Sequence, residues 1–345
     1  MKQGLPKVPT ITKYIADLAA SKYSIEDKKP FTVGIDPFVH PASFEKELND
    51  AFDEANDFGT GDEGDEIIIG TLKTMENGYN PIDEIWGDER PPIPTSPFKV
   101  HPMEYAGESI QSKVKKIHEL MKEKKVTMVV FTALDDVAYL MNVRAKGDIE
   151  TCPVGISYAA VSFDEIALFC DEVKVASSDV KSHLSEANVI VKPYDNIIDY
   201  LQSHLNDNPK AKVWIDKTRS NYALSRIVPE KSLLNSQNPI TPMKSCKNEA
   251  EMEGMRLAHI RDGAAMAKSI SYIENQLVNE SKTFSEVEVD EIITGHRAEQ
   301  PGFQEVSFPT IAGVGSNGAI IHYRAVENTD LLKYLTVNEP ILIDR

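Results

Sequence analysis

The stretch Ser307–Arg324, SFPTIAGVGSNGAIIHYR, gives the clearest local signal in this chain of 345 residues. The apolar residues of Phe303–Ile311 and of Ala319–His322 are typical of strands. Three glycines lie between them and predict a flexible turn. His322 would then end a strand beside this turn, a position at which functional residues often lie. An edge histidine next to a glycine-rich hairpin is the alternative, and the spacing alone does not exclude it.

A second polar residue follows an apolar run near the end of the sequence. Ile341–Ile343 predicts a strand, and Asp344 comes directly after it. A carboxylate that leaves a buried strand costs free energy unless it meets a cation or several hydrogen-bond donors. A metal ion or a structural partner such as a helix N-terminus would each satisfy Asp344, and the residues alone favour neither.

Two predicted helices precede this region, and each begins with the residue types of a capping box. Asn248 with Glu251 and Ser285 with Glu288 have the required spacing. The first helix then carries apolar residues at steps of three or four. His259 falls on this apolar face, where we expect a packing role rather than a ligand role.

The middle of the chain contains the elements of a complete α/β domain. Apolar spacing predicts helices over Ser109–Lys125 and Asn196–Leu205, and a short helix or turn over Leu134–Leu140. Strands are predicted at Val126–Thr132, Ile156–Val161, Ile166–Phe169, Val189–Val191 and Val213–Ile215. The second and third of these strands form a hairpin, because an Asp-Glu turn lies between them.

Asp135 and Asp136 lie at the start of the predicted helix Leu134–Leu140. They could act as general acid and base, but adjacent side chains on a helix point apart. We therefore expect them to cap the helix at Val137. The sequence also lacks the H-E-x-x-H, G-x-S-x-G, P-loop and G-x-G-x-x-G motifs. The residues themselves thus indicate no nucleophilic, phosphoryl or hydride chemistry.

The first block alternates helices with strands. Apolar spacing predicts a helix over Ile11–Ala20 and a buried strand over Lys29–Asp36. A helix capped by Ser43 and a strand over Ile67–Leu72 follow. Between them, Asp57–Glu66 indicates an exposed acidic loop rather than a calcium site, because the ligand spacing of a calcium loop is not met. With so few strands, this block is typical of the back half of a domain. Four closely spaced prolines then predict a semi-rigid linker.

Composition limits the classes of partner. The formal charge of −17 argues against nucleic acid, which needs clustered Lys and Arg. Only three cysteines occur, without C-x-x-C spacing, so a disulfide scaffold or thiolate zinc site is not expected. No apolar run reaches the ~18 residues of a membrane span, and the N-terminus lacks the apolar core of a signal peptide. We therefore expect a cytoplasmic protein with no membrane partner.

Taken together, five stretches identify a family. The sequence resembles cytosolic aminopeptidase P, the Xaa-Pro aminopeptidase family of the creatinase, prolidase and methionine aminopeptidase group. The stretches occur in the family's order and span most of the chain: Val33–Pro37 (VGIDP), Asp83–Pro92 (DEIWGDERPP), Thr132–Arg144 (TALDDVAYLMNVR), Gly254–Asp262 (GMRLAHIRD) and Ser307–Arg324. Prolidase and creatinase share the fold, but Asp83–Pro92 and the S-F-P-T-I segment are more similar to aminopeptidase P.

The resemblance implies the fold class and the domains. We expect creatinase-like N-terminal α/β domains followed by an incomplete pita-bread (α+β) catalytic domain. Residues 1–90 would be the C-terminal part of the first creatinase-like domain and residues 97–243 the second. Residues 246–345 would be the start of the pita-bread metallopeptidase domain.

The resemblance also implies a function. The family releases an N-terminal residue that precedes proline, using water activated by two metal ions, usually Mn²⁺. Its substrates are peptides with proline at the second position. His322 matches the family's substrate-binding histidine near the metal pair, and we predict it as the catalytic and substrate-binding residue. Asp344 matches the first metal-binding aspartate. The resemblance leaves a homodimer open.

Some residues depart from the family pattern. The family continues Leu-Ile-Asp with Ser-Gly, whereas this sequence has Arg345, and the remaining metal ligands are absent from it. Ala325 replaces the proline of the family's His-Tyr-x-Pro. We therefore expect a chain that is truncated at both ends and inactive as a hydrolase by itself. The alternative is a non-catalytic regulatory or protein-binding module derived from aminopeptidase P.

Overall fold

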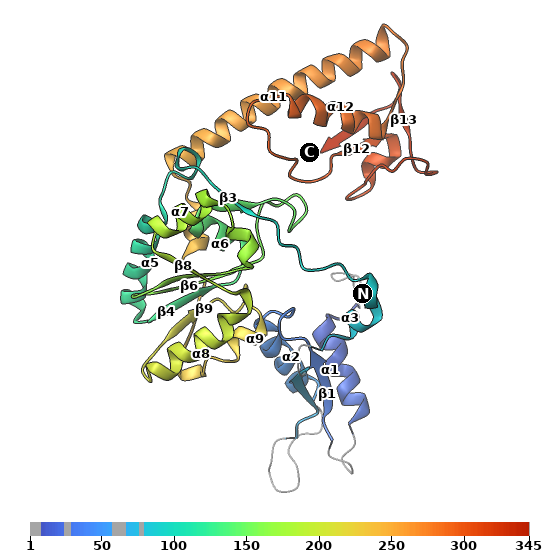
Figure 1. Cartoon of the computed structure of the whole chain (residues 1–345). Coiled ribbons are helices and arrows are strands. Elements are labelled where there is room, and N and C mark those ends of the chain that lie inside the picture. The colour runs from blue at the N-terminus through green and yellow to red at the C-terminus, as the bar shows by residue number, and fades with distance from the viewer. Residues whose placement is uncertain (1–7, 24–28, 57–66, 76–78, 345) are drawn as a thin grey trace. The chain divides into compact units, whose positions relative to one another are not determined.

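The computed structural model describes residues 8–23, 29–56, 67–75 and 79–344. The chain forms two compact units, which are described separately (Figure 1). The first comprises Met1–Val100, Ile110–Val143 and Gly155–Ser245. The second comprises His101–Ser109, Arg144–Val154 and Cys246–Arg345.

The N-terminal part of the first unit pairs two strands beside two helices. Its elements are α1 (Ile11–Lys22), β1 (Phe31–Ile35), α2 (Ser43–Glu54), β2 (Gly70–Thr74), α3 (Pro81–Trp86) and the short 3₁₀ helix η2 (Gly87–Glu89). Strands β1 and β2 are parallel. Leu48 and Phe52 of α2 pack with Ala16, Ala19 and Ile69 in a small core. The predicted helix–strand–helix–strand order is confirmed.

Three details of this part differ from expectation. β1 is not uniformly buried, because only one face of a two-stranded sheet is covered, and Ile35 alone is fully buried. Ser43 does not cap α2: the N-cap position is Ala42, without a side-chain hydrogen bond. β2 begins at Gly70, later than predicted. The predicted acidic loop Asp57–Glu66 lies outside the described residues.

The rest of the first unit is built on a six-stranded sheet with the order β10-β9-β4-β6-β7-β8. Its strands are β4 (Met128–Phe131), β6 (Tyr158–Ser162), β7 (Ile166–Phe169), β8 (Val189–Lys192), β9 (Val213–Ile215) and β10 (Leu233–Asn235). β6 is antiparallel to β4 and β7, which confirms the predicted hairpin, and the other pairs are parallel. Two further strands, β3 (Phe98–Val100) and β5 (Val143–Ala145), lie outside this sheet.

Helices cover both faces of this sheet (Figure 1). They are α5 (Ile110–Lys124), α6 (Leu134–Met141), α7 (Ser178–Glu186), α8 (Ile197–Asp207), α9 (Tyr222–Ser225) and α10 (Ile240–Ser245). The side chains of α8 and α9 pack on one face, where Ile197, Leu201 and Leu224 join the strand residues in one core. With both faces covered, β4, β6 and β9 are buried throughout.

The predicted capping role of Asp135 and Asp136 is wrong. The N-cap residue of α6 makes no side-chain hydrogen bond. Instead, the ammonium group of Lys244 contacts both carboxylates, and Arg219 forms ion pairs with both. Burial raises the pKa of Asp135, but the Lys244 and Arg219 charges outweigh this and lower the pKa overall. The cationic partners of both aspartates come from distant parts of the chain.

The second unit consists mainly of two packed helices and two small strand pairs. Its elements are α4 (Met103–Ala106), α11 (Glu249–Val278), β11 (Phe284–Ser285), α12 (Glu286–Ala298), β12 (Ile311–Val314), the 3₁₀ helix η6 (Gly315–Ala319), β13 (Tyr334–Leu335) and β14 (Ile341–Asp344). β12 pairs with β14, and β11 with β13, both antiparallel. Both predicted capping boxes are present, at the starts of α11 and α12.

The glycine-rich stretch folds differently from expectation. The predicted strand Phe303–Ile311 is wrong, since β12 begins only at Ile311. Ala319–His322 is not a strand either: Ala319 ends η6, and His322 lies in a turn. Gly313 explains this conformation, because a Cβ there would lie 2.7 Å from the backbone nitrogen of Gly318. The glycines therefore let η6 pack directly on β12.

His259 is exposed, so its predicted packing role is also wrong. Within the second unit, the long helix α11 buries only Ala265, Ser269 and Ile273. Its other apolar residues, among them Ile260, remain exposed. The apolar periodicity thus predicted the helix correctly, but not which of its positions the fold covers.

Candidate functional site

The structure brings the two predicted site residues to one cavity. His322 and Asp344 line a concavity of about 410 Å³ in the second unit. The remaining lining residues are Phe308, Pro309, Ile311, Tyr323 and Arg324. This volume is within the range of small-ligand pockets, about 300–1,000 Å³.

Asp344 is held by backbone pairing. In the β12–β14 ladder it lies opposite Ile311, so its position follows from the register of the two strands. Its side chain is exposed rather than buried, and it has no hydrogen bond or ion pair within the described ranges. Since no protein group in the described part of the chain bonds to it, the exposed carboxylate is available to a ligand.

His322 occupies a strained backbone position. Its φ angle is +56°, in the left-handed region, which costs a residue with a Cβ about 1–2 kcal/mol. Such strain is concentrated at functional sites, where the surrounding structure maintains it. The imidazole is exposed at the cavity. The turn, rather than a strand end, presents this side chain.

The sequence reasoning missed the two residues that follow His322. Arg324 is exposed and brings a permanent positive charge to the cavity. Tyr323 is 6% exposed, and its hydroxyl donates a 2.6 Å hydrogen bond to Glu286. Burial and this bond raise the pKa of Tyr323 to about 12. Their direct adjacency to His322 was the signal that could have found them.

The cavity combines an apolar wall with polar groups. Phe308, Pro309 and Ile311 offer apolar contact, and the charged side chains lie at the same opening. Such a cavity can hold a short peptide: its apolar wall can contact the peptide's side chains, and its charged residues can contact the peptide's charged groups. It does not fit a divalent metal pair, because Asp344 is the only carboxylate among the described lining residues. Mn²⁺ prefers about six ligands, and one carboxylate leaves most of them to water.

Within the described ranges, no group of three or more His, Cys, Asp or Glu side chains has an arrangement that could hold a metal ion. These residues by themselves therefore do not define a metal centre.

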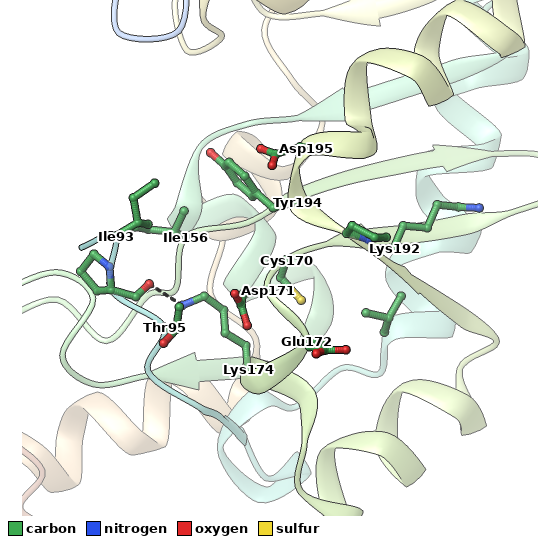
Figure 2. A pocket seen from close by; sticks show the side chains of 13 residues that line it. Ile93, Thr95, Ile156, Cys170, Asp171, Glu172, Lys174, Lys192, Tyr194 and Asp195 are labelled. Carbon is green, nitrogen blue, oxygen red and sulfur yellow. Dashed lines mark hydrogen bonds between the residues drawn. The ribbon is translucent and has the colours of Figure 1, made fainter. Parts of the chain in front are cut away.

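A larger cavity, of about 550 Å³, lies in the first unit (Figure 2). It is formed where β7 and β8 end, with Ile93–Thr95 of the proline-rich linker on one side. Its lysines are engaged: Lys174 donates to the Pro94 carbonyl at 3.3 Å, and Lys192 pairs with Glu165 at 3.3 Å. Burial raises the pKa of the Cys170 thiol to about 12, so it is no nucleophile at neutral pH. Size alone therefore does not make this cavity the reactive site.

Two family matches cover most of the chain. Residues 89–251 match the Creatinase/Prolidase N-terminal domain. Residues 253–345 match Metallopeptidase family M24, and these include the cavity with His322 and Asp344. The chain belongs to the proteins that join a creatinase/prolidase N-terminal domain to an M24 metallopeptidase domain. The predicted fold class, creatinase-like α/β followed by M24-type α+β structure, is confirmed.

Within this group the chain is similar to Xaa-Pro aminopeptidases P. It is 33% identical over 330 residues to "Probable Xaa-Pro aminopeptidase P" of Talaromyces marneffei, covering 94% of this chain and 46% of that relative. It is 35% identical over 332 residues to the protein of the same name from Sordaria macrospora, covering 94% and 50%. The chain thus spans about half the length of the curated relatives that it matches.

A solved structure shows the same similarity to aminopeptidases of this kind. The X-prolyl aminopeptidase of Caenorhabditis elegans, described as a cytosolic enzyme with a di-nuclear active site, superposes with a TM-score of 0.85 at 27% identity. The match covers 100% of this chain and 52% of that one. Separately, no helix in the described part of the chain has the length and apolar character needed to cross a membrane.

Proposed function

We propose that the chain belongs functionally to the Xaa-Pro aminopeptidases, metallopeptidases that release an N-terminal residue preceding proline. The observation that supports this most is the meeting of His322 and Asp344 at one cavity of the M24-matched region. The two residues come from different elements, a turn and the strand β14. The family resemblance implies the roles of both residues independently of this geometry.

In this proposal His322 binds the peptide and takes part in catalysis. The apolar wall formed by Phe308, Pro309 and Ile311 accommodates the proline ring, because it offers apolar contact without competing donors. Asp344 would be one ligand of a divalent metal, with Mn²⁺ as the metal expected from the family, and the described lining of the cavity offers no second carboxylate to hold a pair.

The test of this function is peptide binding. A peptide of the form X-Pro-X, titrated into the chain, is expected to bind at the cavity, and His322→Ala is expected to weaken the binding. The matched control is His259→Ala, since His259 is an exposed histidine of the same unit that does not line the cavity. Equal binding by wild type and His322→Ala would refute the assigned role.

We further propose that residues 1–345 by themselves hydrolyse X-Pro peptides poorly or not at all. The reason is that Asp344 alone supplies too few ligands to retain Mn²⁺. Calorimetric titration with Mn²⁺ should show weak binding only, and the X-Pro peptide should stay intact. Rapid turnover that His322→Ala abolishes would contradict this part of the proposal.

A non-catalytic binding module is the second candidate. It is favoured by a cavity that has peptide-binding character but a single carboxylate. The two candidates differ in Mn²⁺ binding: a chain that carries the first ligand of a metalloaminopeptidase should bind Mn²⁺ weakly through Asp344, whereas a binding module should retain the X-Pro peptide and bind no Mn²⁺ at Asp344.

Other expectations remain proposals. These are the division into residues 1–90, 97–243 and 246–345, a cytoplasmic location, and the choice between monomer and homodimer. The location is supported by the cytosolic description of the Caenorhabditis elegans enzyme. Light scattering of the purified chain distinguishes a monomer from a homodimer.

A further inference from the structure

A fully buried carboxylate lies behind the turn that carries His322. Glu286 is the first residue of α12, and its side chain is 0% exposed. Removing a carboxylate from water costs several kcal/mol unless hydrogen-bond donors replace the solvent. In the sequence this residue does not stand out, because an acidic residue in the first helical turn is common.

Four groups donate to Glu286, and each comes from a different segment. The backbone N–H of Val314 at the end of β12 donates at 2.6 Å, and the side-chain amide of Asn317 in η6 at 3.0 Å. The Tyr323 hydroxyl donates at 2.6 Å and the backbone N–H of Lys333 at 3.0 Å. Glu286 therefore ties β12, η6, the turn and the segment before β13 to the start of α12.

The network keeps the carboxylate ionised. Burial raises the pKa of Glu286, but the hydrogen bonds from Tyr323, Val314, Lys333 and Asn317 together lower it below its usual value. Hydrogen bonds to an ionised acceptor are roughly twice as strong as neutral ones. Tyr323 is further fixed by Asn317, whose amide lies 3.0 Å from the same hydroxyl.

The constraint on His322 comes through its neighbour in the chain. Its imidazole is exposed, and its φ of +56° is a conformation that the chain would leave if it were free to do so. The next residue, Tyr323, is buried, and its hydroxyl is bonded on the far side to Glu286. The constraint on the turn thus comes from Tyr323.

We propose that Glu286 is a positioning residue for His322, acting through the Tyr323 hydroxyl, which ties the strained turn to the start of α12. The inference rests on the proposed role of His322 in peptide binding. In this role Glu286 touches neither peptide nor metal, but it sets the direction of the His322 side chain. Without the Tyr323–Glu286 bond, the turn relaxes and the imidazole samples other directions.

Tyr323→Phe in the full 345-residue chain tests this proposal. The change removes one hydroxyl and keeps the ring that fills the interior. The matched control is Tyr272→Phe, a tyrosine of the same unit that is 42% exposed and has no contact with Glu286 among the described residues. The readout is the ring signal of His322 in a ¹H–¹³C spectrum at fixed neutral pH, assigned by its loss in His322→Ala. Of the other seven histidines, all but His296, whose ring packs against Tyr272, serve as internal references.

The expected result is a shift or broadening of the His322 signal in Tyr323→Phe, with Tyr272→Phe unchanged. Glu286→Gln should disturb the same signal. X-Pro peptide affinity should fall by about fivefold in Tyr323→Phe, the size of one lost hydrogen bond. An unchanged His322 signal in folded Tyr323→Phe overturns the proposal, because a merely structural bond would lower the melting temperature and leave the ring where it was.

The remaining outcomes are also decisive. If Tyr323→Phe does not fold, Glu286→Gln carries the test, and failure of both to fold overturns the positioning role in favour of a folding role. If the wild type binds no X-Pro peptide but the His322 signal moves in Tyr323→Phe, the positioning role stands and the proposed function fails. If the peptide binds and the His322 signal does not move, the proposed function stands and the positioning role fails.

Discussion

Replacing Gly313 by alanine is expected to destabilise the second unit. Gly313 lies in β12, where η6 packs directly against it. A Cβ at this position would lie 2.7 Å from the nitrogen and 2.8 Å from the Cα of Gly318. These are backbone atoms, so the strain cannot be relieved by turning a side chain. Overpacking of this kind costs about 1–3 kcal/mol.

Gly295→Ala provides a control of opposite sign. Gly295 lies inside α12, and an added Cβ would meet nothing within 4 Å. Alanine in a helix interior is favoured over glycine by about 0.5–1 kcal/mol. The two substitutions add the same methyl group to the same unit, so they isolate the effect of the close backbone approach.

Hydrogen exchange measured by mass spectrometry is the suitable assay, because it reports on the second unit separately from the first. Exchange of the amides in β12 and β14 should accelerate in Gly313→Ala, roughly tenfold for every 1.4 kcal/mol lost. It should slow or stay constant in Gly295→Ala. Equal protection in wild type and Gly313→Ala would show that η6 does not pack on β12, and the turn that presents His322 would need another explanation.

Three further predictions concern acid stability, a buried ion cluster and a helix cap. Because the pKa of Glu286 is lowered on folding, its stabilisation is present at pH values above the unfolded value near 4.5 and is lost as the pH falls through the folded value. Acid titration of hydrogen exchange should show this loss in wild type, and Glu286→Gln should flatten it. Lys244→Met should cost about 1–3 kcal/mol, because the 1%-exposed Asp136 loses a donor. The control Lys268→Met, whose partner Glu299 is exposed, should leave the stability in urea nearly unchanged. Asn248→Ala should lower the stability of the start of α11 by about 1 kcal/mol, because it removes the acceptor for the Glu251 N–H. The amides at the start of α11 should then exchange faster. Unchanged exchange would mean that the capping box is not populated.

The sequence was informative wherever the physical cause lies within a few neighbouring residues. The capping boxes at Asn248 and Ser285 depend on contacts over three positions, and both are present. The hairpin of β6 and β7 depends on a short turn between two apolar runs, and it was also predicted correctly. The family resemblance extended this local information to the fold class and to the two site residues, although their roles stay predictions.

Tertiary structure decided the features whose partners are distant in the chain. Asp135 and Asp136 look like a helix cap until Lys244 and Arg219 meet them in the folded unit. His322 follows an apolar run that resembles a strand, yet the packing of η6 on β12 makes it a turn. The reason is general: hydrogen bonds, ion pairs and steric contacts between remote segments outweigh local propensity, and a single sequence does not show which segments meet.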